Sequence, residues 1–245
     1  MNEVEYRKTL ADLWSKYNKE NSLREVLSSG IGLPESFSHN CDILWVGINP
    51  AESKQKEDFF PSFNQLLIDG KGYWKTIKKI LLNCKGNKEH IDLFAFHKTK
   101  QVFLRNTGKD DMQNVALNFF AEHLSATQQF IEDTLKPKLI IIGNKGASAY
   151  FGFDDKYAWM GYDSEVLAPT QLSRETCEIR RITGLRQDEM AKERMVMPKG
   201  QREMRKNRMN NTIVICARFQ GNGCPKPKQL NSEIINEVIE KYCNI

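Results

Sequence analysis

The sequence predicts an α/β protein, a three-layer α/β/α sandwich around a short, mostly parallel sheet of about four strands. Four short apolar runs, at 43–46, 91–96, 139–142 and 212–216, have the length of buried strands. Three of them are almost continuously apolar, which is typical of strands that are covered on both faces. Segments with helical spacing separate the runs, and this alternation favours right-handed crossovers between parallel strands.

The apolar side chains between and around the runs recur three and four residues apart, as on one face of a helix. They predict four helices, around 10–17, 74–81, 116–131 and 234–242. The stretch from about 153 to 211 interrupts the alternation, because it is polar and basic and has no clear period. We therefore expect a single domain, residues 1–245, with a basic polar insertion at about 153–211 before the last strand.

The composition excludes several classes of protein. The chain has 245 residues, of which 40% are apolar and 27% are charged, and this balance excludes collagen, a disordered chain and a coiled coil. No apolar run approaches the ~18 residues of a transmembrane helix, and the acidic N-terminus lacks the pattern of a signal peptide. Six widely spaced cysteines without a CxxC pair favour reduced thiols over a zinc site. We expect a cytoplasmic protein with no metal, no cofactor and no membrane partner.

Positive charge is concentrated in one part of the chain. Residues 174–208 contain eleven Lys and Arg against six Asp and Glu, an excess that equals the net charge of +5 of the whole chain. Such a basic segment predicts contact with a polyanion, and its candidate residues are Lys199, Arg202, Arg205, Lys206 and Arg208. The alternative is an ordinary solvated surface.

Two glycine turns follow predicted strands, where open parallel sheets bind their ligands. The first turn reads Gly47-Ile48-Asn49-Pro50-Ala51, and its Asn-Pro pair can aim the amide over the end of the sheet. The second turn reads Gly143-Asn144-Lys145 and opens a short helix, whose N-terminus could hold a phosphate. For both turns the alternative is a simple connection from a strand to the next element.

His97 directly follows the second apolar run. Its ring could form a hydrogen bond with a base or a phosphate, and the alternative is a solvated loop histidine. Asp92, on the same predicted strand, faces the pocket, a helix or the edge of the sheet. The other histidines, His39, His90 and His123, have no partner at catalytic or metal-binding spacing.

The first turn also belongs to a longer pattern. Gly-Ile-Asn-Pro at 47–50 is followed by the aromatic loop Phe59-Phe60-Pro61-Ser62 and then by Tyr73-Trp74-Lys75, which opens a helix. This order resembles the uracil-DNA glycosylase superfamily, and most closely its mismatch-specific uracil and thymine glycosylase branch. The resemblance is best over 43–82 and continues more loosely to Gly143.

The resemblance implies a DNA glycosylase-like hydrolase, in which water attacks the N-glycosidic bond of a deaminated or mismatched base of the uracil or thymine type. Asn49 would position the water, the rest of the turn 47–51 would line the pocket, and Phe59 or Phe60 would stack on the flipped base. The alternative for the two phenylalanines is core packing. We add the residues at neighbouring strand ends as substrate-binding candidates, namely His97, Gly143 and Asn144. The expected partner is DNA, single-stranded or a mismatched duplex, and no protein partner is evident.

The sequence departs from the family after the last predicted strand. There the family has a His-Pro-Ser or Asn-Pro-Ser motif followed by a wedge, whereas residues 215–225 contain no His and no Pro-Ser pair. Arg218 could contact a phosphate or the leaving base, and Phe219 or Gln220 could fill the vacated place in the base stack. Further DNA contacts are expected from Ser62 and Lys145. Because the second motif is absent, the alternatives are a non-catalytic nucleic-acid or nucleotide binding protein, or hydrolysis of another nucleoside-like substrate.

Overall fold

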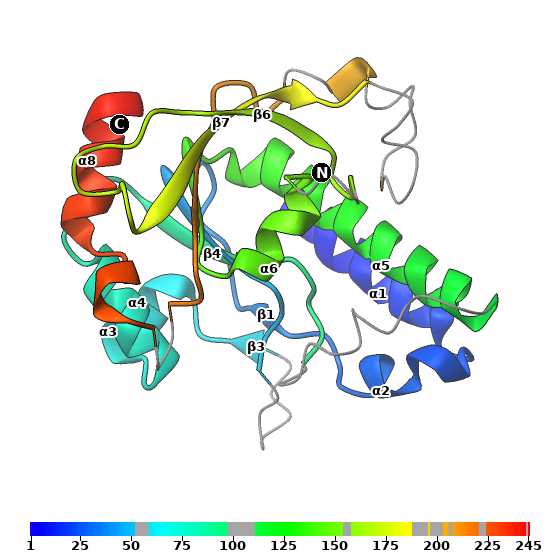
Figure 1. Ribbon diagram of the computed structural model, residues 1–245. Helices are drawn as coiled ribbons and strands as arrows, with labels where there is room; N and C mark the ends of the chain where they lie inside the picture. Colours follow the sequence, from blue (N-terminus) through cyan, green and yellow to red (C-terminus); the bar gives the residue numbers. More distant parts are fainter. Residues whose placement is uncertain are drawn as a thin grey trace.

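A computed structural model describes residues 1–51, 59–97, 111–153, 158–187, 196, 203–205, 208–220, 224–243 and 245, without the side chains of 59, 111–115 and 145. In this part of the chain a six-stranded mixed sheet lies between two layers of helices (Figure 1). The predicted α/β class is confirmed, with helices on both faces of the sheet.

Four strands form the parallel part of the sheet, in the order β4 (Lys88–Asp92), β2 (Ile43–Gly47), β5 (Leu139–Ile142) and β8 (Ile213–Ala217). Two antiparallel strands continue the sheet beyond β8, first β7 (Cys177–Leu185) and then β6 (Tyr162–Val166). The prediction of about four strands is therefore wrong, because the expected insertion supplies two more. In β7 the charged pair Arg180 and Arg181 separates buried Ile179 from buried Ile182, so a search for continuous apolar runs misses this strand.

The edge strand β4 begins earlier than predicted. It covers 88–92, whereas the apolar run was expected to form a strand over 91–96. Residues 93–96 follow the strand and are buried in the core. Asp92 therefore lies at the carboxyl end of β4, level with Gly47 at the end of β2.

Helices cover both faces of the sheet (Figure 1). α1 (Glu3–Tyr17) and α5 (Asp111–Phe130) share one core with Leu44 and Val46, and α3 (Phe63–Asp69), α4 (Tyr73–Leu81) and α8 (Ser232–Tyr242) share the other with Ile43 and Trp45. Successive residues of β2 thus enter different cores, which explains why this strand is apolar throughout. The four predicted helices are confirmed within α1, α4, α5 and α8, with the end of the third in a π-helical turn, Ile131–Leu135.

Local signals fix the helix ends. Asn2 and Glu5 form a capping box at the start of α1, and the Asn231 side chain caps α8 by accepting from a backbone amide. The remaining labelled elements are short, namely α2 (Arg24–Leu27), β1 (Leu33–Pro34), β3 (Phe59–Phe60) and α6 (Lys145–Ser148). β1 and β3 pair with each other in parallel. None of the helices in the described ranges is long and apolar enough to cross a membrane.

Candidate functional site

The carboxyl ends of the four parallel strands lie at one edge of the sheet. Gly47 ends β2 and pairs in register with Asp92, the last residue of β4. β5 ends one residue before Gly143, and β8 ends one residue before Arg218. The fold therefore brings together the turns after β2, β4, β5 and β8, in which most of the candidate residues were predicted.

A cavity opens along the outer edge of β4. The segment 31–38 runs beside this edge in the opposite direction. At one end the Gly32 amide donates to the Ala95 carbonyl at 2.6 Å, and at the other end the Ser38 amide donates to the Glu89 carboxylate. Between these two bonds the segment and the strand line a cavity of 160 Å³.

Aromatic rings form one wall of the cavity. Phe60 of β3, Phe63 of α3 and Trp74 of α4 line it together with Pro50 and Ala51 of the first turn. A protein cavity of about 150 Å³ is known to hold a benzene molecule. The space along β4 therefore fits a single six-membered ring.

His90 and Asp92 form the polar wall. Nε2 of His90 lies 3.6 Å from Oδ1 of Asp92, and the two side chains are only 12% and 17% exposed. The His90 ring packs edge-on against Trp74, with 4.8 Å between the ring centroids. Gly47 leaves room for this pair, because a Cβ there would collide with the Asp92 carboxylate. The expectation that His90 has no partner is wrong, since residues two apart on a strand share a face.

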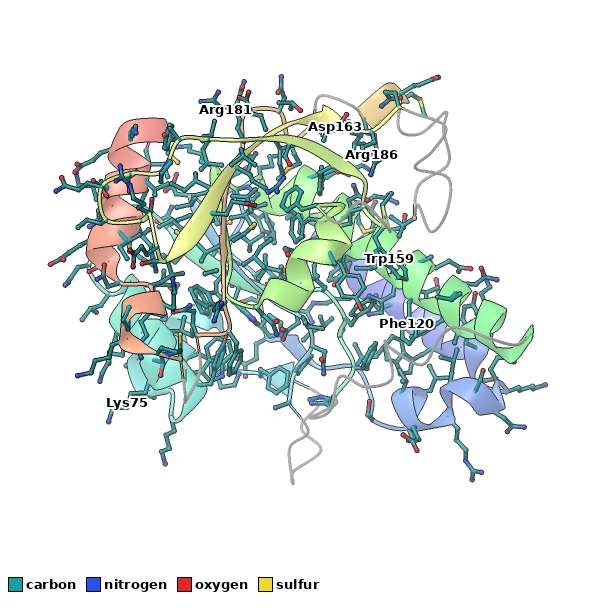
Figure 2. The ribbon with its side chains drawn as sticks, viewed as in Figure 1. Lys75, Phe120, Trp159, Asp163, Arg181 and Arg186 are labelled. Atoms are coloured by element: carbon teal, nitrogen blue, oxygen red, sulfur yellow. The ribbon has the colours of Figure 1, made fainter. Side chains whose placement is uncertain are left out.

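Tyr73 lies outside the cavity lining and connects Trp45 of β2 with Phe219 after β8. Its hydroxyl accepts a hydrogen bond of 2.9 Å from Nε1 of Trp45. Burial, reinforced by the Asp92 charge, raises the pKa of Tyr73 well above its ordinary value, so the hydroxyl stays protonated. The ring stacks on Phe219, with 6.0 Å between centroids and 7° between planes. Lys75, the last residue of the predicted Tyr73-Trp74-Lys75 motif, lies exposed on the outer surface of α4 (Figure 2).

Asn49 is half-buried in the turn after β2. Its amide nitrogen donates to the Pro50 carbonyl at 2.9 Å and to the Phe96 carbonyl at 3.4 Å. These bonds hold the amide nitrogen toward the protein. Because a carbonyl oxygen has two lone pairs, Oδ1 has the capacity to accept from a water molecule. The next two residues of the turn line the cavity, so the turn and the cavity adjoin.

His97 is buried, so the alternative of a solvated loop histidine is wrong. Its Nδ1 lies 3.3 Å from the carbonyl oxygen of Ala51, and its ring centroid lies 5.1 Å from that of Phe60. Gly32 makes space for the imidazole, because a Cβ at this position would lie 2.5 Å from Nε2. His97 thus supports two residues of the cavity wall from behind.

The turn after β5 is occupied by packing and capping contacts. Gly143 lies against the ring of Trp45, where a Cβ would collide with the indole. Asn144 caps α6 by accepting a hydrogen bond of 2.9 Å from a backbone amide of that helix. Ile48 is buried beside the same turn. These contacts explain why the three residues are present, and they place the turn next to the first one.

The three candidate residues after β8 differ in their surroundings. Arg218 is exposed, and Phe219 is 51% exposed. Gln220 is buried, and its side-chain amide donates to the carbonyls of Arg218 and Lys228 and accepts from the Leu230 amide. Gln220 therefore holds the loop together, and the predicted role of filling a base stack does not fit these contacts.

The predicted basic segment is partly neutralised by ion pairs. Nε of Arg205 donates to the buried Glu132 carboxylate at 2.8 Å, and Asp133 lies 3.3 Å from the same guanidinium. Arg208 is 56% exposed and lies 3.8 Å from Asp133. The predicted DNA contact by Arg205 is therefore corrected to a structural ion pair. Ser62, another predicted DNA contact, caps α3. The remaining candidates lie outside the described residues, namely Lys199, Arg202, Lys206 and the side chains of Phe59 and Lys145.

Sequence reasoning missed the pairing of His90 with Asp92 and the place of Trp74 in the cavity wall. The available signal was the alternation His90-Ile91-Asp92 at the start of the predicted strand, which puts two polar side chains on one face. Within the described ranges, no group of three or more His, Cys, Asp or Glu residues could hold a metal ion.

Comparisons with known proteins identify no match to this chain. No family model matches the chain, and no curated protein and no solved structure matches it either. The geometry of the site and the motif at 47–75 therefore carry the functional argument.

Proposed function

We propose that the chain holds one flipped-out, single-ring base of a nucleic acid in the cavity beside β4 and hydrolyses the N-glycosidic bond of that base. The observation that carries this proposal is the ring-sized cavity, with aromatic rings on one wall and the pair of His90 and Asp92 on the other. The resemblance of 47–75 to uracil-DNA glycosylases supports the same reaction class, with DNA as the substrate and uracil or thymine as the base.

The aromatic wall accounts for binding of the base. A base stacked on an aromatic ring contributes about 1–3 kcal/mol, which is comparable to the few kcal/mol that flipping a base costs. Phe60 and Trp74 both line the cavity and offer such a ring. A volume of 160 Å³ is close to that of a cavity known to hold one six-membered ring, so the base that we assign to it is a single-ring base.

The polar wall accounts for the choice among pyrimidines. An ionised carboxylate only accepts hydrogen bonds, so Asp92 favours a base that presents an N–H at the ring edge. Uracil and thymine have such an imide N–H, whereas cytosine has an acceptor nitrogen at the same place. The site is therefore expected to reject cytosine, the normal counterpart of uracil.

The chemistry divides between Asn49 and His90. A neutral amide is a weak base, so Asn49 would orient the attacking water and the rate would depend on departure of the base. A ring N–H of His90 can donate a hydrogen bond to the departing base, and Asp92, 3.6 Å from Nε2, orients the imidazole. This imidazole would take the place of the one that the family carries after its last strand.

The test is base release from defined oligonucleotides. Single strands, matched duplexes and G·T or G·U mismatched duplexes are incubated with the protein, and alkali then breaks the strand wherever a base has been lost. We expect release of uracil or thymine, and loss of about 10²–10⁴-fold in rate for His90→Gln, the usual contribution of a positioned acid. Asn49→Ala is expected to abolish release with little change in affinity. His39→Gln is the matched control, because His39 is 59% exposed and lies outside the cavity lining.

Two outcomes would contradict the proposal. Binding of every oligonucleotide without any strand break would favour the alternative, a non-catalytic nucleic-acid binding protein. Unchanged release by both Asn49→Ala and His90→Gln would place the chemistry outside this cavity.

A further inference from the structure

A second cleft, the basic groove, lies between the start of β7 and the end of β8. Cys177 of β7 pairs with Ala217 of β8, so these two strand ends are neighbours (Figure 1). The groove has a volume of 470 Å³. Its lining contains four cationic residues and two carboxylates, namely Arg174, Arg180, Arg218 and Lys228 against Glu175 and Glu178. They come from three separate parts of the chain, so it is the fold that gathers this charge.

Two of these cations have no anionic partner in the described structure. Arg180 is paired with a carboxylate on its own strand, and Lys228 donates to the backbone carbonyl of Glu175 at 2.6 Å. Arg174 and Arg218 are exposed, and neither forms an ion pair with a described residue. The groove therefore presents two guanidinium groups whose donors face solvent.

We propose that the basic groove binds the phosphodiester backbone of a nucleic-acid strand. The inference deepens the proposed function and rests on it for the claim that this strand carries the base that enters the cavity. A guanidinium presents parallel N–H donors that match two phosphate oxygens, which a lysine ammonium does not. Because Arg174 and Arg218 line the same groove, they can hold phosphates of the same strand.

The surface beyond the groove leads toward the cavity. Arg218 is followed by Phe219, which is 51% exposed and stacks on Tyr73. The Tyr73 ring in turn lies 5.3 Å, centroid to centroid, from the ring of Trp74, which lines the cavity. A strand that leaves the groove therefore meets an exposed aromatic ring and then the aromatic wall of the cavity.

This arrangement favours a single strand over a duplex. A cationic groove next to an exposed ring is the combination by which proteins hold unpaired nucleic acids, since free bases stack on the ring while the groove follows the phosphates. A duplex keeps its bases stacked on each other and would use only the phosphate contacts. Single-stranded oligonucleotides are accordingly expected to bind more tightly at equal salt.

The experiment measures binding, not base release. Fluorescence anisotropy follows a labelled 15-nucleotide oligothymidylate, as a single strand and as a duplex with its complement, over a series of salt concentrations. The test variant is Arg174→Gln with Arg218→Gln. The control is Lys8→Gln with Arg24→Gln, which removes the same charge from exposed positions on α1 and α2. Thermal unfolding of all three proteins verifies that they are folded.

The expected result is a lower salt dependence in the groove variant alone. Each phosphate contact on a single strand contributes about 0.7 to the slope of log affinity against log salt, so losing two contacts flattens the slope by about 1.4. The control is expected to keep the parental slope. A parental slope in the groove variant, or equal loss in the control, would overturn the proposal.

The binding experiment and the base-release experiment together distinguish this proposal from the proposed function. Release of uracil by a groove variant that binds like the parent would refute the groove and leave the hydrolase standing. Binding that depends on the groove, without base release by the parent or by either variant, would support the groove and refute the hydrolase. Tighter binding of the duplex than of the single strand would refute the preference for a single strand, and failure of the parent to bind either probe would refute the groove altogether.

Discussion

Replacement of Arg205 by Gln is expected to destabilise the protein by about 3 kcal/mol at pH 7, because it removes the cation from a buried ion pair. The Glu132 side chain is 0% exposed and Arg205 is 14% exposed. Besides Arg205, the Tyr162 hydroxyl donates to this carboxylate at 2.8 Å. Without the guanidinium, the Tyr162 hydroxyl and the Gln128 side chain would remain to stabilise a fully buried negative charge.

The magnitude follows from the cost of protonating Glu132 instead. Burial already raises the pKa of this carboxyl above its ordinary value of 4.5, and loss of Arg205 raises it further. Keeping the carboxyl neutral at pH 7 costs about 3.4 kcal/mol relative to the unfolded chain, at about 1.36 kcal/mol per pH unit above the unfolded pKa. This is the upper limit for the substitution, because the raised pKa of Glu132 means that the parent already carries part of the cost. At pH 5 the same cost is about 0.7 kcal/mol. The contribution of this carboxyl to the stability of the variant is therefore complete below pH 4.5 and is lost as the pH rises from there through the folded pKa.

The assay is equilibrium unfolding in urea at pH 5 and pH 7. Arg208→Gln is the control, because Arg208 is 56% exposed and lies near Asp133 from the same segment; a loss below about 1 kcal/mol is expected for it at both pH values. In a Glu132→Gln background, Arg205→Gln is expected to cost much less. The reasoning is refuted if Arg205→Gln costs no more than Arg208→Gln at pH 7, or if its cost does not fall at pH 5.

Three further predictions concern stability. Burial lowers the pKa of His123 to about 3. The stability that the neutral imidazole contributes is therefore lost as the pH falls below 6.5. Unfolding in urea should show a free energy of unfolding about 2 kcal/mol lower at pH 5 than at pH 8, and His123→Gln should lack this difference. Gly143→Ala forces a methyl group against Trp45 and is expected to cost about 1–3 kcal/mol, seen as a lower melting temperature. Gln220→Ala leaves the buried Leu230 amide without its acceptor and is expected to cost about 1–3 kcal/mol in the same measurement.

The centre of the fold could be predicted because its strands are covered on both faces. Ile43 to Val46 and the four residues of β5 are all buried, and such runs are visible in a sequence. β7 was not predictable in this way, since Arg180 and Arg181 interrupt it and are satisfied by carboxylate partners. The partner of Arg180 is Glu178 on the same strand, whereas the partner of Arg181 is Glu165 on the neighbouring strand β6, a pairing that no local pattern reports.

The candidate site was predicted in part. The turn that contains Asn49 does lie at the end of a parallel strand beside a cavity, as the position of glycine and proline indicated. The polar wall of that cavity depends on register: His90 and Asp92 face it because β4 begins at Lys88, three residues before the expected start. The role of Arg205 could not be read from charge alone, because its partner Glu132 is seventy-three residues away in the chain.

The segment 31–38 has a consequence for association between molecules. The outer edge of a terminal strand carries backbone groups that can pair with a strand of another chain. Along β4 this edge is shielded by 31–38, the same segment that closes the cavity. Any change that detaches 31–38 from β4 would therefore open the cavity and, at the same time, expose the unpaired backbone groups of this edge strand. Self-association that rises with protein concentration would then be an early sign that the binding site itself is damaged, and a molecule seated in the cavity would protect the protein from aggregation.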